Sequence, residues 1–130
     1  MQDAAPASIE TTELILPAQA NHYGTLFAGN ALSMMANAAY AAASRQARGN
    51  VVLASVDGLR FTAPVPVGSL LNLSARIARS GRSSMQVEVT GHCETPGAED
   101  RRQIAQGQFT MVAVGKTGRP KKITVEGETR

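Results

Sequence analysis

One uninterrupted helical segment, residues 30–48, limits the possible folds of this chain more than any other feature. It is rich in Ala, Leu and Met, contains no Gly or Pro, and stops at Gly49. Its polar side chains share one face at helical spacing, and small apolar residues make the opposite face. The polar face holds Asn30, Ser33, Asn37, Tyr40 and Ser44, and the apolar face holds Ala31, Leu32, Met35, Ala38, Ala39 and Ala42. Because small side chains let another backbone come close, we expect a sheet to wrap around this helix.

The remaining patterned segments alternate apolar and polar residues with the period of a β-strand. Short turns between consecutive strands favour an antiparallel sheet. The sequence therefore predicts an α+β fold with a five-stranded antiparallel sheet and one long helix. All 130 residues are assigned to a single domain, with disorder at residues 1–7 and a basic, flexible tail at residues 116–130. The expected strands are residues 9–16, 51–63, 70–80, 83–94 and 102–114.

The amino-acid composition limits which classes of protein this chain can belong to. Hydrophobic residues make up 43% of the chain, enough for one buried core, whereas aromatic residues make up only 4% and Trp is absent. A core of such small side chains gains burial by oligomerising, so we expect a dimer or a larger assembly. No apolar run approaches the ~18 residues that a membrane span needs, and residues 1–8 do not resemble a signal peptide. These features favour a cytoplasmic protein.

Charge and metal-ligand residues exclude further classes. The single cysteine, Cys93, rules out a disulfide within one chain and a cysteine-based metal site. His22 and His92 show no ligand spacing, so no metal is expected. The net charge of +3 suits an anionic small molecule or nucleic acid. The scarcity of aromatic residues makes a nucleic-acid-binding module the weakest of these hypotheses.

A polar, glycine-containing loop, residues 21–29 with the sequence NHYGTLFAG, leads directly into the helix. Backbone N–H groups at a helix start are unpaired and carry partial positive charge, so they can hold an oxyanion or polarise a carbonyl. Gly29 would let a ligand approach that helix start closely. The alternative is that Gly29 serves only the turn, and the sequence alone favours neither.

This loop and helix, followed by residues 51–57 (VVLASVD), 61–68 (FTAPVPVG) and 79–89 (RSGRSSMQVEV), resemble the hotdog acyl-CoA thioesterases of the bacterial short-chain and brain acyl-CoA hydrolase group. The resemblance covers roughly residues 12–115. It implies a hotdog fold and a dimer whose sheets join edge to edge, often assembled further into tetramers or hexamers. It also implies active sites at the dimer interface that hydrolyse an acyl-CoA to free acid and coenzyme A, with no cofactor.

The resemblance assigns roles to two residues and shows one departure. Asn21 would orient water or substrate, and the backbone N–H of Gly29 would polarise the thioester carbonyl. The relatives carry Asp or Glu nine residues after the position of Phe27, and that position here is Ala36. A methyl group can neither take up a proton nor attack a carbonyl. A second hypothesis therefore stays open: an acyl-CoA-binding hotdog protein that is non-hydrolytic or catalytically impaired, or an Asp-to-Ala variant of an active enzyme.

Several residues are candidates to replace the missing acid or to bind the substrate. Asp57 is the first candidate for a base, because its strand should run close to the helix; its alternative is a structural hydrogen-bond acceptor. Ser33 has no His–Asp relay that would activate it. The turn at residues 79–84 would, by resemblance, meet the pantetheine and phosphates of coenzyme A, unless it is only a solvated hairpin. The substrate-binding residues expected from this reasoning are His22, Gly24, Phe27, Asn37, Arg79, Gly81, Arg82, Ser83 and Ser84.

Two further groups complete the expected site. Met34 and Met35 are expected to line the acyl pocket. Four cations near the C-terminus would attract nucleotide phosphates or simply form a basic tail. These cations are Lys116, Arg119, Lys121 and Lys122.

Overall fold

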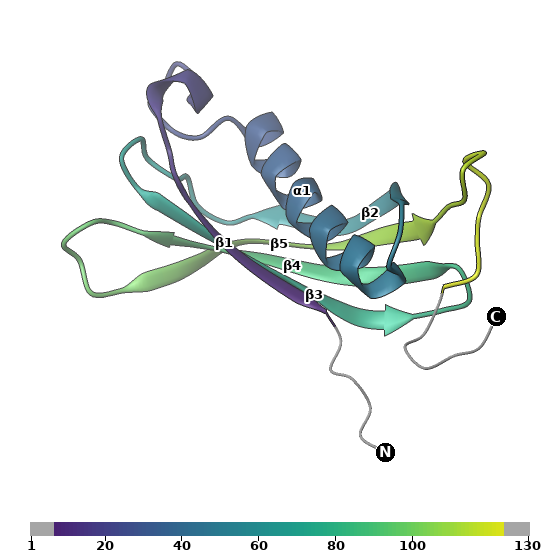
Figure 1. Ribbon diagram of the computed structural model, residues 1–130. Helices are drawn as coiled ribbons and strands as arrows, with labels where there is room; N and C mark the ends of the chain where they lie inside the picture. The colour runs from purple at the N-terminus through teal and green to yellow at the C-terminus, as the bar shows by residue number, and fades with distance from the viewer. Residues whose placement is uncertain (1–6, 124–130) are drawn as a thin grey trace.

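A computed structural model describes residues 7–123 of the chain. One long helix lies diagonally across one face of a curved sheet (Figure 1). A single turn of 3-10 helix, η1, precedes it. In chain order the elements are β1 (Ser8–Leu14), η1 (Pro17–Gln19), α1 (Ala28–Ala47), β2 (Val51–Phe61), β3 (Leu70–Ser80), β4 (Ser84–Glu94) and β5 (Arg101–Ala113).

The five strands form one antiparallel sheet in the order β1-β3-β4-β5-β2. The predicted five-stranded antiparallel sheet with one long helix is therefore confirmed. The helix begins at Ala28, earlier than predicted, and ends at Ala47, because the following Arg48 has a left-handed φ of 58°. Since α1 links the two outermost strands, β1 and β2, it crosses the sheet from one edge to the other.

The core lies between α1 and the concave face of the sheet. Alternate residues of β3 and β4 point toward the helix and are buried, as their period-two pattern predicts. Phe109 on β5 is the largest fully buried side chain in the described part of the chain. The helix meets this face mainly through alanines, with Met34 and Met35 as its large buried side chains. Leu32, which the sequence assigned to the buried face, is only half-buried.

The edge strand β2 is the most exposed strand of the sheet. Its register against β5 shifts twice, between Leu53 and Ser55 and between Asp57 and Arg60. Three of its apolar side chains are 40–48% exposed: Val52, Leu53 and Phe61. An edge strand also presents unpaired N–H and C=O groups, so this edge is open to pairing with another strand.

Residues 115–123 fold back onto the end of the sheet. The Gly115 N–H donates to the Arg119 carbonyl at 2.9 Å, and the Ile123 N–H donates to the Arg82 carbonyl at 3.0 Å. The Ile123 side chain is buried. The prediction of a flexible tail is therefore wrong for residues 116–123, while residues 124–130 lie outside the described part.

The N-terminal prediction can be compared with the structure only at its last residue. The N–H of Ala7 donates to Gln46 Oε1 at 3.0 Å, and the Ala7 carbonyl accepts a hydrogen bond from the Ile77 N–H at 3.2 Å. Ala7 is therefore ordered, contrary to the prediction, and residues 1–6 lie outside the described part.

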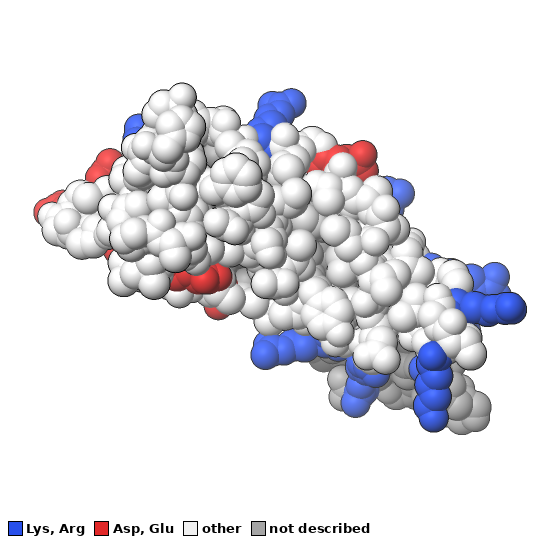
Figure 2. All heavy atoms as spheres, turned by 90° about the horizontal axis from the view of Figure 1, so that it is seen from above, with Lys and Arg blue, Asp and Glu red and all other residues white. Residues whose placement is uncertain are grey.

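Charged side chains are unevenly distributed. Figure 2, which looks down on the molecule from above, shows Lys and Arg gathered at one end and a large uncharged area over the middle. That end carries the β3–β4 turn and the folded-back residues 115–123, with Arg79, Arg82, Lys116, Arg119 and Lys121. Among the described residues, no helix is both long and apolar enough to cross a membrane.

Candidate functional site

A pocket of about 380 Å³ opens between the start of α1 and the concave face of the sheet. Its polar lining residues, Asn21, Thr25 and Thr62, are exposed or half-buried. Most of its apolar walls are buried, so the pocket has a polar mouth and an apolar interior. The apolar lining residues are Leu26, Ala28, Ala31, Met35, Phe61, Ala63, Pro64, Val65, Leu71, Leu73, Ile104 and Ala105.

Asn21 is held in one orientation by the loop that carries it. Its Oδ1 accepts hydrogen bonds from the Tyr23 N–H at 2.9 Å, the Thr25 N–H at 3.2 Å and the Thr25 hydroxyl at 3.2 Å. These three donors fix which end of the amide is oxygen. Because Oδ1 is committed to the loop, the group that Asn21 can offer to a ligand is its Nδ2, a hydrogen-bond donor.

The start of α1 supplies two further donors. The N–H groups of Asn30 and Ala31 both donate to the Phe27 carbonyl, whereas the N–H groups of Ala28 and Gly29 find no acceptor within residues 7–123. No side chain caps the helix, and its first turn has no acidic residue. The partial positive charge of this helix start is therefore not neutralised by the described residues, and it is available to an anion or a polarised carbonyl.

Gly29 makes room for the ring of Phe27, a role that differs from both expected ones, the approach of a ligand and the requirement of the turn. Its backbone is not left-handed, so the turn does not require glycine. A Cβ built on Gly29 would lie 2.6 Å from Cε2 of Phe27, so any side chain here would require the Phe27 ring to move. The Phe27 ring, 54% exposed, thus occupies the place of a side chain beside the helix start.

The structure does not bring Asp57 to the pocket. Asp57 pairs with Gln108, on the face of the sheet opposite to α1, and its side chain is exposed. The expectation that Asp57 lies close to the helix, where it could act as a base, is therefore wrong. The physical reason is the register shift between Leu53 and Ser55, because one extra residue in a strand turns every later side chain to the other face.

The helix candidates lie beside the pocket but do not line it. Ala36 is half-buried and packs against the core, and Ser33 and Asn37 are exposed. His22 and Gly24 are exposed in the loop, where the rings of His22 and Tyr23 are 4.0 Å apart. Within one chain, these residues surround the pocket region without contributing to its walls.

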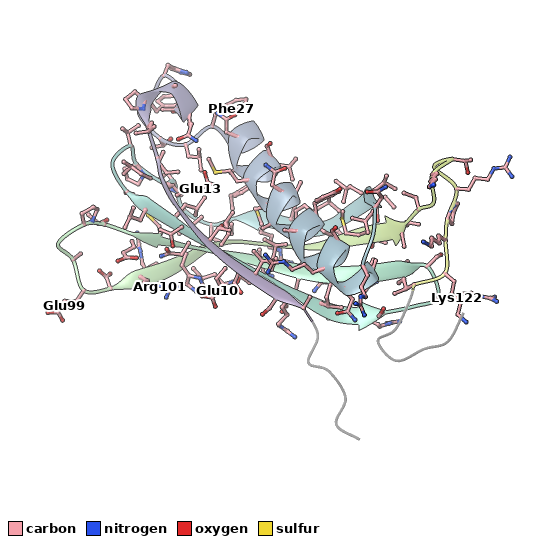
Figure 3. The ribbon with its side chains drawn as sticks, in the orientation of Figure 1. Glu10, Glu13, Phe27, Glu99, Arg101 and Lys122 are labelled. Atoms are coloured by element: carbon pink, nitrogen blue, oxygen red, sulfur yellow. The ribbon has the colours of Figure 1, made fainter. Side chains whose placement is uncertain are left out.

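The turn at residues 79–84 lies at the other end of the sheet from the pocket. Figure 3 labels Phe27 at the start of α1 and Lys122 at the opposite end of the molecule. Lys122 neighbours Ile123, whose N–H donates to the Arg82 carbonyl, and the Ala113 N–H donates to the Ser83 carbonyl at 2.7 Å. The predicted substrate-binding residues are thus divided between two opposite ends of the folded molecule.

Sequence reasoning missed most of the pocket. Met35 lines it as expected, whereas Met34 is buried but does not line it. Leu71, Leu73 and Ala105 were assigned only to strands, and a buried alternating residue carries no signal that separates a pocket wall from a core contact. The Asn21–Thr25 loop did carry a signal, because Asn commonly accepts hydrogen bonds from the backbone just after it.

The pocket has no ionisable lining residue in the part of the chain that the structure describes. In the same residues no three His, Cys, Asp or Glu side chains are grouped so that they could hold a metal ion. What the pocket offers is therefore hydrogen-bond donors at its mouth and apolar surface inside. Such a combination fits a carbonyl compound with an aliphatic tail.

A single helix across a five-stranded antiparallel sheet, with a pocket beneath the helix start, defines the hotdog class of domains. The chain belongs to the thioesterase superfamily, whose family model matches residues 23–99. It is 36% identical over 127 residues to an uncharacterised acyl-CoA thioester hydrolase of Zymomonas mobilis, covering 97% of this chain and 85% of the relative. It spans only about a fifth of the length of mammalian acyl-CoA thioesterases that it also matches.

Three solved structures extend the comparison. An apo-hexameric acyl-CoA thioesterase superposes with a TM-score of 0.88 at 34% identity, covering 95% of this chain and 80% of that one. An acyl-CoA hydrolase from Staphylococcus aureus, in complex with butyryl-CoA, coenzyme A and coenzyme A disulfide, superposes with a TM-score of 0.86 at 27% identity, covering 92% and 73%. A variant of the Staphylococcus enzyme with an aspartate replaced by alanine superposes similarly, with a TM-score of 0.85.

The two substitutions Asn21→Ala and Asn21→Asp should separate the structural and the ligand-binding atoms of this side chain. Asn21→Ala removes all three loop hydrogen bonds and should lower the free energy of unfolding by about 1–3 kcal/mol. Asn21→Asp keeps an oxygen for the same donors and should change it by less than about 0.5 kcal/mol. Urea denaturation at one protein concentration measures both; equal losses in the two variants would contradict the assigned orientation.

Proposed function

We propose that the protein hydrolyses acyl-CoA thioesters to a free acid and coenzyme A. The observation that carries the proposal is the pocket mouth, which Asn21 and Ala28 line and which leads to an apolar interior. The N–H groups of Ala28 and of its neighbour Gly29 find no acceptor among the described residues. Relatives and structural neighbours named acyl-CoA hydrolases support hydrolysis over simple acyl-CoA binding.

The reaction begins with the thioester carbonyl oxygen at the start of α1. The N–H groups of Ala28 and Gly29 stabilise the negative charge that develops on this oxygen as water attacks the carbonyl carbon. Asn21 Nδ2 orients the carbonyl or the water. The new carbon–oxygen bond forms, the carbon–sulfur bond breaks, and the coenzyme A thiolate takes up a proton.

Water activation is the weakest step of this site. By the resemblance, Ala36 holds the position of an acid, and no ionisable described residue lines the pocket. The proton of the attacking water then passes to solvent rather than to a carboxylate, and hydrolysis is slower than it would be with a general base.

A second copy of the chain completes the site. Two β2 edges related by a two-fold axis pair in antiparallel directions, so the Phe61 end of one strand lies beside the Val51 end of the other. The Val51 end of the molecule also carries the end of α1 and the cationic turn with Arg82. Pairing therefore brings one subunit's cations toward the other's pocket, where they attract the phosphates of coenzyme A.

Asn21→Asp should abolish most of the hydrolysis while leaving the fold intact. It replaces the Nδ2 donor with an oxygen that repels the substrate carbonyl, and the loss of such a donor typically lowers kcat by about 10²- to 10³-fold. Release of coenzyme A thiol from a panel of acyl-CoA substrates measures the rate. Gln86→Glu, the same amide-to-acid change on an exposed residue of β4, is the control and should keep its rate. Thiol release from no substrate by the unchanged protein would refute the proposal.

Ala36→Asp should accelerate hydrolysis. It places a carboxylate at the position where the resemblance predicts one, and a well-placed general base contributes about 10²- to 10⁴-fold. The control is Ala36→Asn, which has nearly the same size but cannot take up a proton. The measurement is kcat for both variants against the same substrates. An equal rate for Ala36→Asp and Ala36→Asn would show that water is activated from elsewhere.

Leu53→Lys should weaken the pairing of β2 edges and, with it, hydrolysis. A lysine on this 44% exposed edge residue places a charge where two copies meet. Light scattering after size-exclusion chromatography should show a smaller assembly, and thiol release should fall in parallel. Leu14→Lys, at the end of the other edge strand, is the control. A smaller assembly with full activity would show that one chain suffices.

A further inference from the structure

We propose that the pocket holds a medium-length aliphatic acyl chain, and that Gly91, behind the pocket floor, sets the longest chain that fits. The inference rests on the proposed function, because it assigns the acyl part of the same substrate. Gly91 does not line the pocket itself and acts through the residues that do.

The pocket walls identify the chemistry of the occupant. The interior residues Leu71, Leu73 and Ala105 are buried, whereas the polar lining residues are exposed or half-buried and belong to the mouth. Donors at the mouth suit the thioester carbonyl. An interior with no charged lining residue among those described suits an uncharged hydrocarbon tail.

The volume sets the length class. A methylene group needs about as much space as a water molecule, roughly 30 Å³. The 380 Å³ pocket therefore accommodates on the order of ten such groups. Part of this space lies at the polar mouth and belongs to the carbonyl. A medium-length chain fills the remainder, whereas an acetyl group leaves most of the apolar wall uncovered.

Gly91 supports the floor of the pocket from behind. It is buried in β4, between Leu73 on β3 and Ala105 on β5, with which it pairs directly. A Cβ at this position would lie 3.2 Å from Leu73 Cδ2, 3.3 Å from Ala105 Cβ and 3.5 Å from Leu71 Cδ1. All three residues line the pocket. A side chain at position 91 therefore requires Leu73 and Ala105 to give way by a few tenths of an ångström, and the open pocket is where we expect them to move.

A second buried glycine provides a matched comparison. A Cβ at Gly107 on β5 would lie 3.2 Å from Leu59 Cδ1 and 3.3 Å from Phe109 Cε1. Its contacts are as tight as those at Gly91, yet neither Leu59 nor Phe109 lines the pocket. Gly107→Ala thus introduces the same crowding into the same sheet without reaching the acyl chain.

The test measures affinity for non-hydrolysable thioether analogues of acyl-CoA, with saturated chains of increasing length, by isothermal titration calorimetry. In the unchanged protein each buried methylene should tighten binding about fourfold until the pocket is full. We call the chain length at which the affinity stops rising the end point. In Gly91→Ala the end point should come one or two methylenes earlier. The affinity for the longest chain that fits should then fall about four- to fifteenfold, whereas the affinity for the shortest chain should not change. Gly107→Ala should leave the end point unchanged, and Leu73→Ala, which enlarges the floor, should extend it.

The outcomes separate this inference from the proposed hydrolysis. If the end point is the same in the unchanged protein, Gly91→Ala and Leu73→Ala, the inference is overturned, even when thiol release continues. A shifted end point in a protein that releases no thiol supports the inference and refutes hydrolysis. Thermal unfolding monitors the fold of each variant. If Gly91→Ala does not fold, the direction of the Leu73→Ala shift decides.

Discussion

The close packing of an alanine-rich helix on a concave sheet is the constraint on which the rest of the structure depends. Alanines at 38, 39, 42 and 43 are buried and let the backbone of α1 lie near β3 and β4. At the start of the helix, the chain instead places its loop and small residues such as Ala28 and Ala31 over the sheet. The space that remains there is the pocket, so tight packing at one end and an opening at the other come from the same helix.

The order of the elements and their periodicity were predictable because they follow from local pattern. Residues 70–80 alternate regularly and form β3 with the expected bounds, and the helix ends one residue before the expected Arg48. The helix start was placed too late because Phe27 is an uncommon N-cap and gives no side-chain signal. The loop with Asn21 was recognisable because its chemistry is local.

The rest of the site could not be predicted, because strand register and the contacts between distant segments have no local signal in the sequence. Strict alternation from Leu53 would turn Asp57 toward the helix, and a single extra residue in β2 turns it away. Residues 21–29 and 79–84 lie at opposite ends of the molecule, and no local pattern in the sequence indicates this separation. The pocket floor, Leu71, Leu73 and Ala105 above Gly91, looks in the sequence like ordinary core.

The doubly shifted edge strand has a consequence for the newly made chain. A long, regular and apolar edge invites any other strand to add to it, which is the route to aggregation. The two irregularities of β2 and the exposed charges of Asp57 and Arg60 interrupt that edge. These features reduce the number of positions at which a strand from another, still unfolded chain could add to β2. The irregular edge is therefore a protection against aggregation while the chain folds.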